Sequence, residues 1–310
     1  MKNIDFKRIA LKTLKFVIIF VITDFLFGTL ASKLFFNQET GKYARSTYVI
    51  KKAKEDIIVF GSSHAHRHYV PEVISEKLSK TCYNAGADGQ QLVYHNVLQK
   101  MILNRYHPEI IILNIDEEFL FKSNKSIDRL GDLHPYYFDF KDELNATFKL
   151  VKQPKDPKLL LKSYQNNSTL IQAVKYYLKP KKTLNGYRPL YEKMTEQKLI
   201  AHKNTNFKKD YTKEIDSANI KILKEFINRS KQHNIKLVFF TSPNLIRKNN
   251  TKNKSLNLIR QIANKESIPF YDFINNPGYL NKLDLFYDPS HLNDIGARKF
   301  TIEVCKLINQ

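Results

Sequence analysis

The sequence predicts an α/β fold in which a parallel sheet is flanked by helices. Short runs of apolar, often β-branched residues recur along the chain and end in glycine, asparagine or proline. Such runs are typical of strands buried on both faces. Segments with apolar residues at helical spacing separate most of these runs, as the crossovers between parallel strands require. At 310 residues, the chain is long enough to bury one sizeable core.

The first of these runs, residues 57–60, leads directly into Gly61, two serines and His64. Glycine permits a sharp turn, and a serine on such a turn stands clear of the strand end. A base and a substrate can then both approach its hydroxyl. We therefore interpret Ser63 as a candidate nucleophile. An ordinary solvated turn is the alternative interpretation of the same residues.

Strands and helices alternate after this turn. Pro71 suits the first turn of a helix, which we expect to run to Lys80, and a short strand follows at residues 81–84. A helix over residues 90–106 and a strand over residues 110–115 come next. Ligands of parallel sheets bind beyond the carboxyl ends of the strands, which is where Ser63 and Gly89 would both lie.

Residues 117–215 do not continue this alternation, and they predict a mostly helical insertion. The insertion leaves from the carboxyl end of the third strand, where such segments commonly shape specificity. The alternation resumes with a helix over residues 217–233, a strand over 236–243, a helix from near Ser255 and a strand over 268–273. We expect a last helix over residues 295–308.

The segment before this last helix places Asp288 and His291 three residues apart. A serine is a poor nucleophile at neutral pH and needs an imidazole to take its proton. A carboxylate must also fix the imidazole tautomer and stabilise its charged form. Ser63, His291 and Asp288 are therefore our candidate catalytic residues.

Three blocks in this order, GSSH (61–64), NAGADG (84–89) and DPSHLN (288–293), resemble the SGNH or GDSL-like hydrolase superfamily. The resemblance implies a flavodoxin-like three-layer fold over residues 55–310, a serine mechanism without a cofactor, and an oxyanion hole made by the backbone N–H groups of Ser63 and Gly89. Membrane-anchored members of the family often act on envelope polysaccharides. The implied function is an esterase or O-acyltransferase acting on acyl, chiefly acetyl, esters of a cell-envelope glycan.

Two departures from the family pattern bear on this function. Ser62 stands where the name-giving members have aspartate. The third block normally ends in an asparagine that donates to the oxyanion. This chain offers Asn114 early and then Asp116, Glu117 and Glu118, whose carboxylates do not donate unless protonated. Losing one such donor typically costs about 100- to 1,000-fold in rate. A catalytically inactive SGNH-fold binding or assembly protein of the envelope is therefore the alternative.

Three further side chains are candidates for the substrate cleft: His64, Asn84 and Asn114. Histidines at positions 64, 66 and 68 suggest a metal site, but nothing specifies the further ligand that catalytic zinc needs, so we expect no metal. Cys82 and Cys305 lack metal-ligand spacing. Free buried thiols are favoured for both, although an exported chain would permit a disulfide.

Basic residues near the N-terminus precede an apolar stretch, Phe16 to Phe36, that is long enough to cross a bilayer core of about 30 Å. This pattern predicts an uncleaved signal anchor with the remaining bulk outside the cytoplasm. Residues 1–36 would be a basic stub and a transmembrane helix, residues 37–54 a linker and residues 55–310 the catalytic domain. Asp24 interrupts the span, and we expect it to mark a membrane-protein partner. A cytosolic protein with one apolar helix is the alternative.

Fifty-one Lys and Arg residues against 30 Asp and Glu residues give a net charge of +21. Such a charge attracts polyanions, whether nucleic acid, anionic lipid or acidic glycan. No nucleic-acid-binding module accompanies it, so we expect the partners to be the membrane and an acylated glycan and not nucleic acid. A membrane-tethered polyanion binder, in which the triad is coincidental, is the remaining alternative.

Overall fold

The computed structural model describes residues 6–123, 127–152, 156–204 and 211–310. The chain folds as two compact units. The first unit comprises residues 1–44 and 130–181, and the second comprises residues 45–129 and 182–310. Every residue of the three SGNH-like blocks belongs to the second unit.

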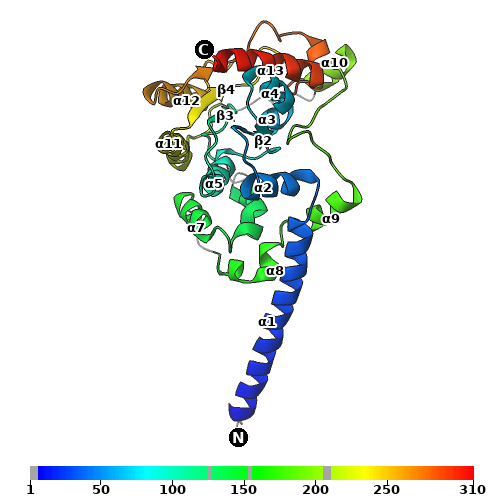
Figure 1. The fold of residues 1–310 in the computed structure, drawn as a ribbon, viewed down its shortest axis with the longest axis vertical. Coiled ribbons are helices and arrows are strands. Elements are labelled where there is room, and N and C mark those ends of the chain that lie inside the picture. Colours follow the sequence, from blue (N-terminus) through cyan, green and yellow to red (C-terminus); the bar gives the residue numbers. More distant parts are fainter. Residues whose placement is uncertain (1–5, 124–126, 153–155, 205–210) are drawn as a thin grey trace. The chain divides into compact units, whose positions relative to one another are not determined.

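A parallel sheet of five strands forms the centre of the second unit (Figure 1). Its strand order is β2-β1-β3-β4-β5, the flavodoxin-like form of the doubly wound sheet. The predicted α/β fold class is therefore confirmed. The strands are β1 (Ile57–Phe60), β2 (Cys82–Asn84), β3 (Ile110–Asn114), β4 (Lys236–Phe240) and β5 (Phe270–Tyr271).

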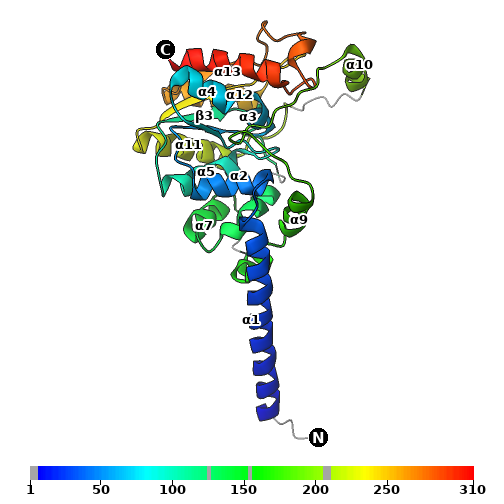
Figure 2. The same cartoon turned by 45° about the vertical axis from the view of Figure 1, so that its right-hand side comes forward.

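Helices cover both faces of the sheet because alternate strand residues point to opposite sides. Ile57 and Val59 join a core with residues of α3 (Ser63–His68), α4 (Pro71–Leu78) and α13 (Asp294–Ile308). Phe60 points to the other side, where its ring contacts Phe226 of α11 (Ser217–Gln232) and His95 of α5 (Leu92–Leu103). Figure 2 shows the strands between α4 and α13 on one side and α5 and α11 on the other.

Strand β5 is shorter than the predicted run of residues 268–273. Pro269 has no N–H to donate to a ladder, and only Phe270 and Tyr271 pair with β4. The connection between β4 and β5 contains α12 (Lys254–Lys265), close to its predicted start. The other elements of this unit are α10 (Glu196–Asn204), η3 (Leu283–Leu285) and most of α2 (Gly41–Lys51), which lies in the predicted linker.

The first unit is helical and is built on α1 (Phe6–Phe36), the long blue helix in Figure 1. By length and composition, α1 is the one helix of the described residues that is long and apolar enough to cross a membrane, a test that a signal sequence also passes. At its C-terminal end, Phe35 packs against the rings of Tyr43 and Tyr136. The remaining elements are most of η1 (Arg129–Tyr136), α7 (Lys141–Leu150), η2 (Pro157–Leu160), α8 (Lys162–Gln165) and α9 (Leu170–Leu178).

Candidate active site

The turn after β1 presents Ser63 at the carboxyl edge of the sheet. Gly61 has φ +141, a conformation that L side chains rarely adopt, and a Cβ there would lie 2.9 Å from the backbone oxygen of Asn114. Ser62 occupies the position before α3, and Ser63 is the first residue of that helix. The sequence therefore turns the chain sharply enough to bring the serine hydroxyl out of the strand, as predicted.

The three candidate catalytic residues form one hydrogen-bonded chain. His291 Nε2 lies 2.9 Å from Ser63 Oγ, and His291 Nδ1 lies 2.8 Å from Asp288 Oδ2. The carboxylate accepts from Nδ1–H, which leaves the Nε2 lone pair facing the serine hydroxyl. This is the arrangement in which an imidazole can take the serine proton.

Asp288 is held in place by its own turn. Its Oδ1 atom accepts from the backbone N–H groups of Ser290 and His291, both at 2.9 Å. Burial favours the protonated carboxyl, but the hydrogen bond and charge of His291 and these two N–H groups outweigh it and hold the pKa of Asp288 well below its ordinary value. Asp288 is therefore a carboxylate at neutral pH.

A second histidine anchors the residue that follows His291. The N–H of Leu292 donates to Nε2 of His68 at 3.0 Å, and His68 is fully buried in α3. Burial holds the pKa of His68 well below its usual range, so the ring is neutral and its Nε2 can accept. The helix that begins with Ser63 thus also positions the loop that carries His291.

The NAGADG block lies beside the turn after β1. The side chain of Asn84 is fully buried; it donates to the carbonyls of Ala65 and Tyr69 and accepts from the N–H of Gly86. Asn84 therefore joins the second block to α3 and does not line the cavity described below, contrary to its prediction as a cleft residue. The amide of this buried asparagine is engaged by three backbone groups, so it is not placed to contact a substrate.

Gly89 ends this block in the left-handed region, with φ +70. In the described part of the chain, the N–H groups of Ser63 and Gly89 donate to no other protein group, so both remain available to an oxyanion. The guanidinium of Arg129 lies against Gly89 at the position that a Cβ would occupy. Arg129 was not predicted as a site residue, because it lies forty positions after Gly89 in the sequence and only the fold brings the two together.

The third block supplies a carboxylate in place of an oxyanion-donating amide. Asn114 is fully buried, and its Oδ1 accepts from Tyr69 and Ser242. It does not line the cavity described below, contrary to its prediction as a cleft residue. Asp116 accepts from His64 Nδ1 at 2.8 Å. Burial lowers the pKa of His64 although Asp116 opposes this, so the imidazole is neutral and its Nε2 is an acceptor.

A cavity of about 200 Å³ opens at this edge of the sheet. Its wall combines backbone and side chains from the segments that follow all five strands, as expected for a doubly wound sheet. Ser63, Gly89 and His64 all line it. The other lining residues are Ser62, Gln91, Ile115, Asp116, Glu117, Glu118, Thr241, Ser242, Asn244, Lys248 and Ile274.

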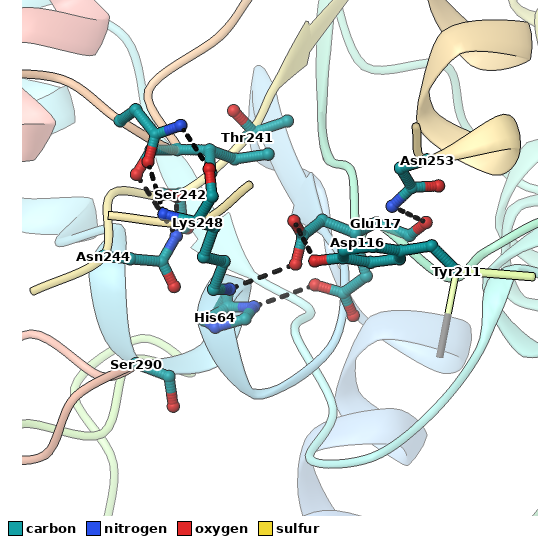
Figure 3. A network of polar contacts seen from close by, with 12 residues as sticks. His64, Asp116, Glu117, Tyr211, Thr241, Ser242, Asn244, Lys248, Asn253 and Ser290 are labelled. Atoms are coloured by element: carbon teal, nitrogen blue, oxygen red, sulfur yellow. Dashed lines mark hydrogen bonds and ion pairs between the residues drawn. The ribbon is translucent and has the colours of Figure 1, made fainter. Parts of the chain in front are cut away.

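Opposite charges line the wall that β3 and β4 provide (Figure 3). Lys248 Nζ lies 3.0 Å from Glu117 Oε2, and the hydroxyl of Tyr211 donates to Glu117 Oε1. The backbone carbonyl of Glu117 also accepts from Asn253. The contacts of Lys248, Tyr211 and Asn253 with Glu117 were not predicted, since they depend on loops that meet only when the sheet forms.

Some further predictions concern metals and thiols. Among the described residues, no group of three or more His, Cys, Asp or Glu side chains is arranged to hold a metal ion. His66 and Asp88 pair instead, with Nδ1 and Oδ1 2.8 Å apart. Cys82 and Cys305 are free and buried, which confirms the favoured prediction for both.

Neither the protein-family models nor the curated protein sequences contain a match to this chain. Among solved structures, it is similar to an acetyl xylan esterase, with 14% identity, a TM-score of 0.37 and coverage of 81% of this chain and 99% of that one. It is also similar to a putative acylhydrolase from Bacteroides fragilis, with 10% identity, a TM-score of 0.38 and coverage of 86% and 95%. Likenesses this distant assign neither a family nor a reaction.

Proposed function

We propose that this chain is a membrane-anchored, extracytoplasmic serine esterase or O-acyltransferase that acts on acyl, chiefly acetyl, esters of a cell-envelope glycan. The observation that carries the proposal is the hydrogen-bonded chain from Ser63 through His291 to Asp288, beside a cavity that Ser63 lines. A fold used only for binding has no need of a serine, a base and a carboxylate in this order.

In the first step, Ser63 Oγ attacks the ester carbonyl and His291 Nε2 takes the hydroxyl proton. The new O–C bond places the negative charge on the former carbonyl oxygen, where the N–H groups of Ser63 and Gly89 stabilise it. Collapse of this intermediate breaks the ester C–O bond. His291 returns its proton to the departing alcohol, and the acyl group remains on Ser63.

In the second step, water or a sugar hydroxyl attacks the acyl-enzyme. His291 again takes the proton and then returns it to Ser63 Oγ, so the enzyme is regenerated. His64 lines the cavity with a neutral ring fixed by Asp116, and its Nε2 is suited to accept a hydrogen bond from the incoming hydroxyl. Hydrolysis and transfer differ only in whether the hydroxyl that attacks the acyl group belongs to water or to a sugar.

The dimensions of the cavity favour a small acyl group. Its volume of about 200 Å³ is below the roughly 300–1,000 Å³ of typical pockets for drug-sized ligands. The wall contains serine, threonine, asparagine and glutamate side chains, which suit a hydroxylated acceptor better than a long acyl chain. An acetyl ester of a glycan meets both requirements.

The anchoring part of the proposal rests on α1. Its apolar composition and length suit a membrane span, and basic residues at its N-terminal end (Lys7, Arg8, Lys12 and Lys15) favour a cytoplasmic location for that end. The second unit would then lie outside the cytoplasm. Lys2, a further residue of the predicted basic stub, lies outside the described residues.

Mass spectrometry of the acyl-enzyme tests the reaction. The full-length protein in detergent is mixed with p-nitrophenyl acetate and quenched, and we expect one acetyl group on the peptide that contains Ser63. The Ser63→Ala and His291→Ala variants should carry none. Acetylation elsewhere, or no acetylation of the folded wild-type protein, would contradict the proposal. Faster loss of the acetyl group when a glycan acceptor is added would identify a transferase.

One observation favours the alternative of an inactive binding or assembly protein. Asp116 occupies the region where the third block of the SGNH pattern has its donating asparagine, and its carboxylate accepts from His64. If this carboxylate abolishes catalysis, Ser63→Ala should leave the cellular phenotype of the wild-type protein unchanged. A phenotype that is lost in Ser63→Ala would exclude this alternative.

A further inference from the structure

Helix α9 of the first unit has an apolar face that the described residues leave uncovered. Ile171, Val174 and Leu178 recur at helical spacing and are 72%, 40% and 76% exposed. The opposite side of α9 is attached to the rest of the unit through buried Ala173 and through Tyr177, whose hydroxyl donates to the carbonyl of Leu34 in α1. A contiguous exposed apolar face of this kind marks an interaction surface.

Helix α1 carries Asp24, Gly28 and Ser32 on the side that meets α8 and the residue after it. The Asp24 carboxylate accepts from the backbone N–H groups of Lys162 and Ser163, at 2.9 and 3.1 Å, and also from the Ser163 hydroxyl. Further along, Ser32 Oγ accepts from Asn166. A Cβ on Gly28 would lie 2.5 Å from the backbone of Lys162, so only glycine allows this approach.

This seam follows the rules for helices packed within a membrane. There, small residues let backbones approach and polar groups must find partners inside the protein. Asp24 has three such partners within the chain. The predicted membrane-protein partner at Asp24 is not tested by the structure of a single chain, and it is not needed to satisfy this carboxylate.

The other side of α1 is bare at the same level. Leu26 and Leu30 are 63% and 59% exposed, although α8 is docked on the opposite side of the helix through Asp24. Apolar exposure therefore continues past the point where the helices of the first unit begin to cover α1. The medium that covers the N-terminal part of α1 would also cover this part.

The length of the span places α9 in the same medium. A bilayer core of about 30 Å needs about 20 helical residues, so a crossing that begins after Lys15 ends near Phe35. Helix α9 is bonded to α1 at Leu34, which lies at the end of this crossing. A tyrosine at that level is typical of a membrane interface.

On the basis of the proposed membrane anchor, we infer that α9 lies in the membrane interface beside α1 and contacts lipid through Ile171, Val174 and Leu178. Lys175 and Lys179 lie beside this apolar face on the helix and are exposed. Basic residues in this position can contact anionic lipid headgroups. The occupant of the surface is thus the lipid itself.

Spin labels on single introduced cysteines test this inference. The full-length protein is reconstituted into vesicles of phosphatidylcholine and phosphatidylglycerol, with labels at Ile171→Cys or Leu178→Cys. Leu26→Cys on α1 is the lipid reference, and Lys265→Cys, exposed on α12, is the aqueous reference. The wild-type chain measures the background, since both of its own thiols are buried.

We expect the labels at positions 171 and 178 to collide with oxygen several-fold more often than the label at 265, and with a water-soluble nickel chelate several-fold less often. Values close to those at 265, with lipid-like values at 26, would overturn the inference and leave the anchor intact. Protection from both reagents at 171 and 178 would indicate a protein partner and also overturn it. Aqueous values at 26 would refute the anchor itself.

Discussion

Two His–Asp pairs lie beside Ser63, and only one of them is hydrogen-bonded to the serine. His291 bridges Asp288 and the serine hydroxyl, whereas His64 is bonded to Asp116 and faces the cavity. The centroids of the two imidazole rings are 5.4 Å apart. Only the first pair is placed to activate the serine. The second pair is available for the hydroxyl that receives the acyl group.

This division of roles predicts a specific defect in His64→Gln. Formation of the acyl-enzyme should change only a few-fold, because His291 and Asp288 are untouched. The second step should slow by about 10-fold, because the incoming hydroxyl loses the hydrogen bond to His64 while His291 still takes its proton. Pre-steady-state kinetics with p-nitrophenyl acetate would then show a preserved burst and a slower steady rate. A lost burst with an unchanged steady rate would contradict the assignment.

At the scale of elements, the site depends on the turn between β1 and α3. Gly61 is enclosed by Ala65, whose Cβ would lie 2.8 Å from a new Cβ, and by the backbone of Asn114. Strand register brings the next block alongside, since the N–H of Ala87 donates to the carbonyl of Gly61 at 2.9 Å. The nucleophile and a candidate oxyanion donor are therefore set by one turn and its neighbour.

We expect Gly61→Ala to lower the free energy of unfolding by about 3 kcal/mol, from backbone strain and overlap with Asn114. Urea unfolding of the full-length protein in detergent measures this change. Gly278→Ala is the matched control, because its new Cβ would meet only the ends of the Asn276 and Lys299 side chains, at 3.1 and 3.6 Å. Equal losses for both variants would contradict the role of the turn.

The elements were predictable to different degrees for a physical reason. Strands β1, β3 and β4 are apolar on both faces, so their composition marks them, and Ser63, His291 and Asp288 belong to residue types that few other roles require together. Asn84 and Asn114 were misplaced because their hydrogen-bond partners, Tyr69 among them, are distant in sequence. Local pattern does not reveal which polar side chain the core will use.

At the scale of the whole molecule, burial of imidazoles links folding to pH. Burial lowers the pKa of His66 and of His95 to about 4 each, from 6.5. His95 is fully buried among the rings of Phe60, Tyr94 and Phe119, and its side chain has no hydrogen-bond partner in the described residues. Protons therefore bind the unfolded chain more readily than the folded one between these pKa values.

The stability that neutral histidines contribute is complete above about pH 6.5 and is lost as the pH falls toward about 4. Each such histidine adds about 1.4 kcal/mol per pH unit to this loss. His95→Leu removes one of them. As the pH falls through this range, the free energy of unfolding of the variant should therefore decrease less steeply than that of the wild type, by about 1.4 kcal/mol per pH unit. Denaturant titrations at several pH values would contradict the account if the two curves ran parallel.

The division into two units was not predicted. The α1 stretch and the helical insertion were recognised separately, by apolar length and by the break in alternation. Within the first unit, the α1 stretch and the insertion are joined by hydrogen bonds from Lys162 and Ser163 to Asp24, which lies 138 and 139 positions earlier in the chain. A lone acidic residue in an apolar helix indicates that a partner exists, but it does not say which segment supplies it.

The central claim is that His291 activates Ser63 as a nucleophile. Labelling of the full-length protein with a fluorophosphonate probe measures this most directly, because the probe reacts with an activated serine. We predict labelling of the wild type and of Ser62→Ala at Ser63, and none of Ser63→Ala or His291→Ala. A folded wild-type protein that does not react, or labelling that persists in His291→Ala, would contradict it.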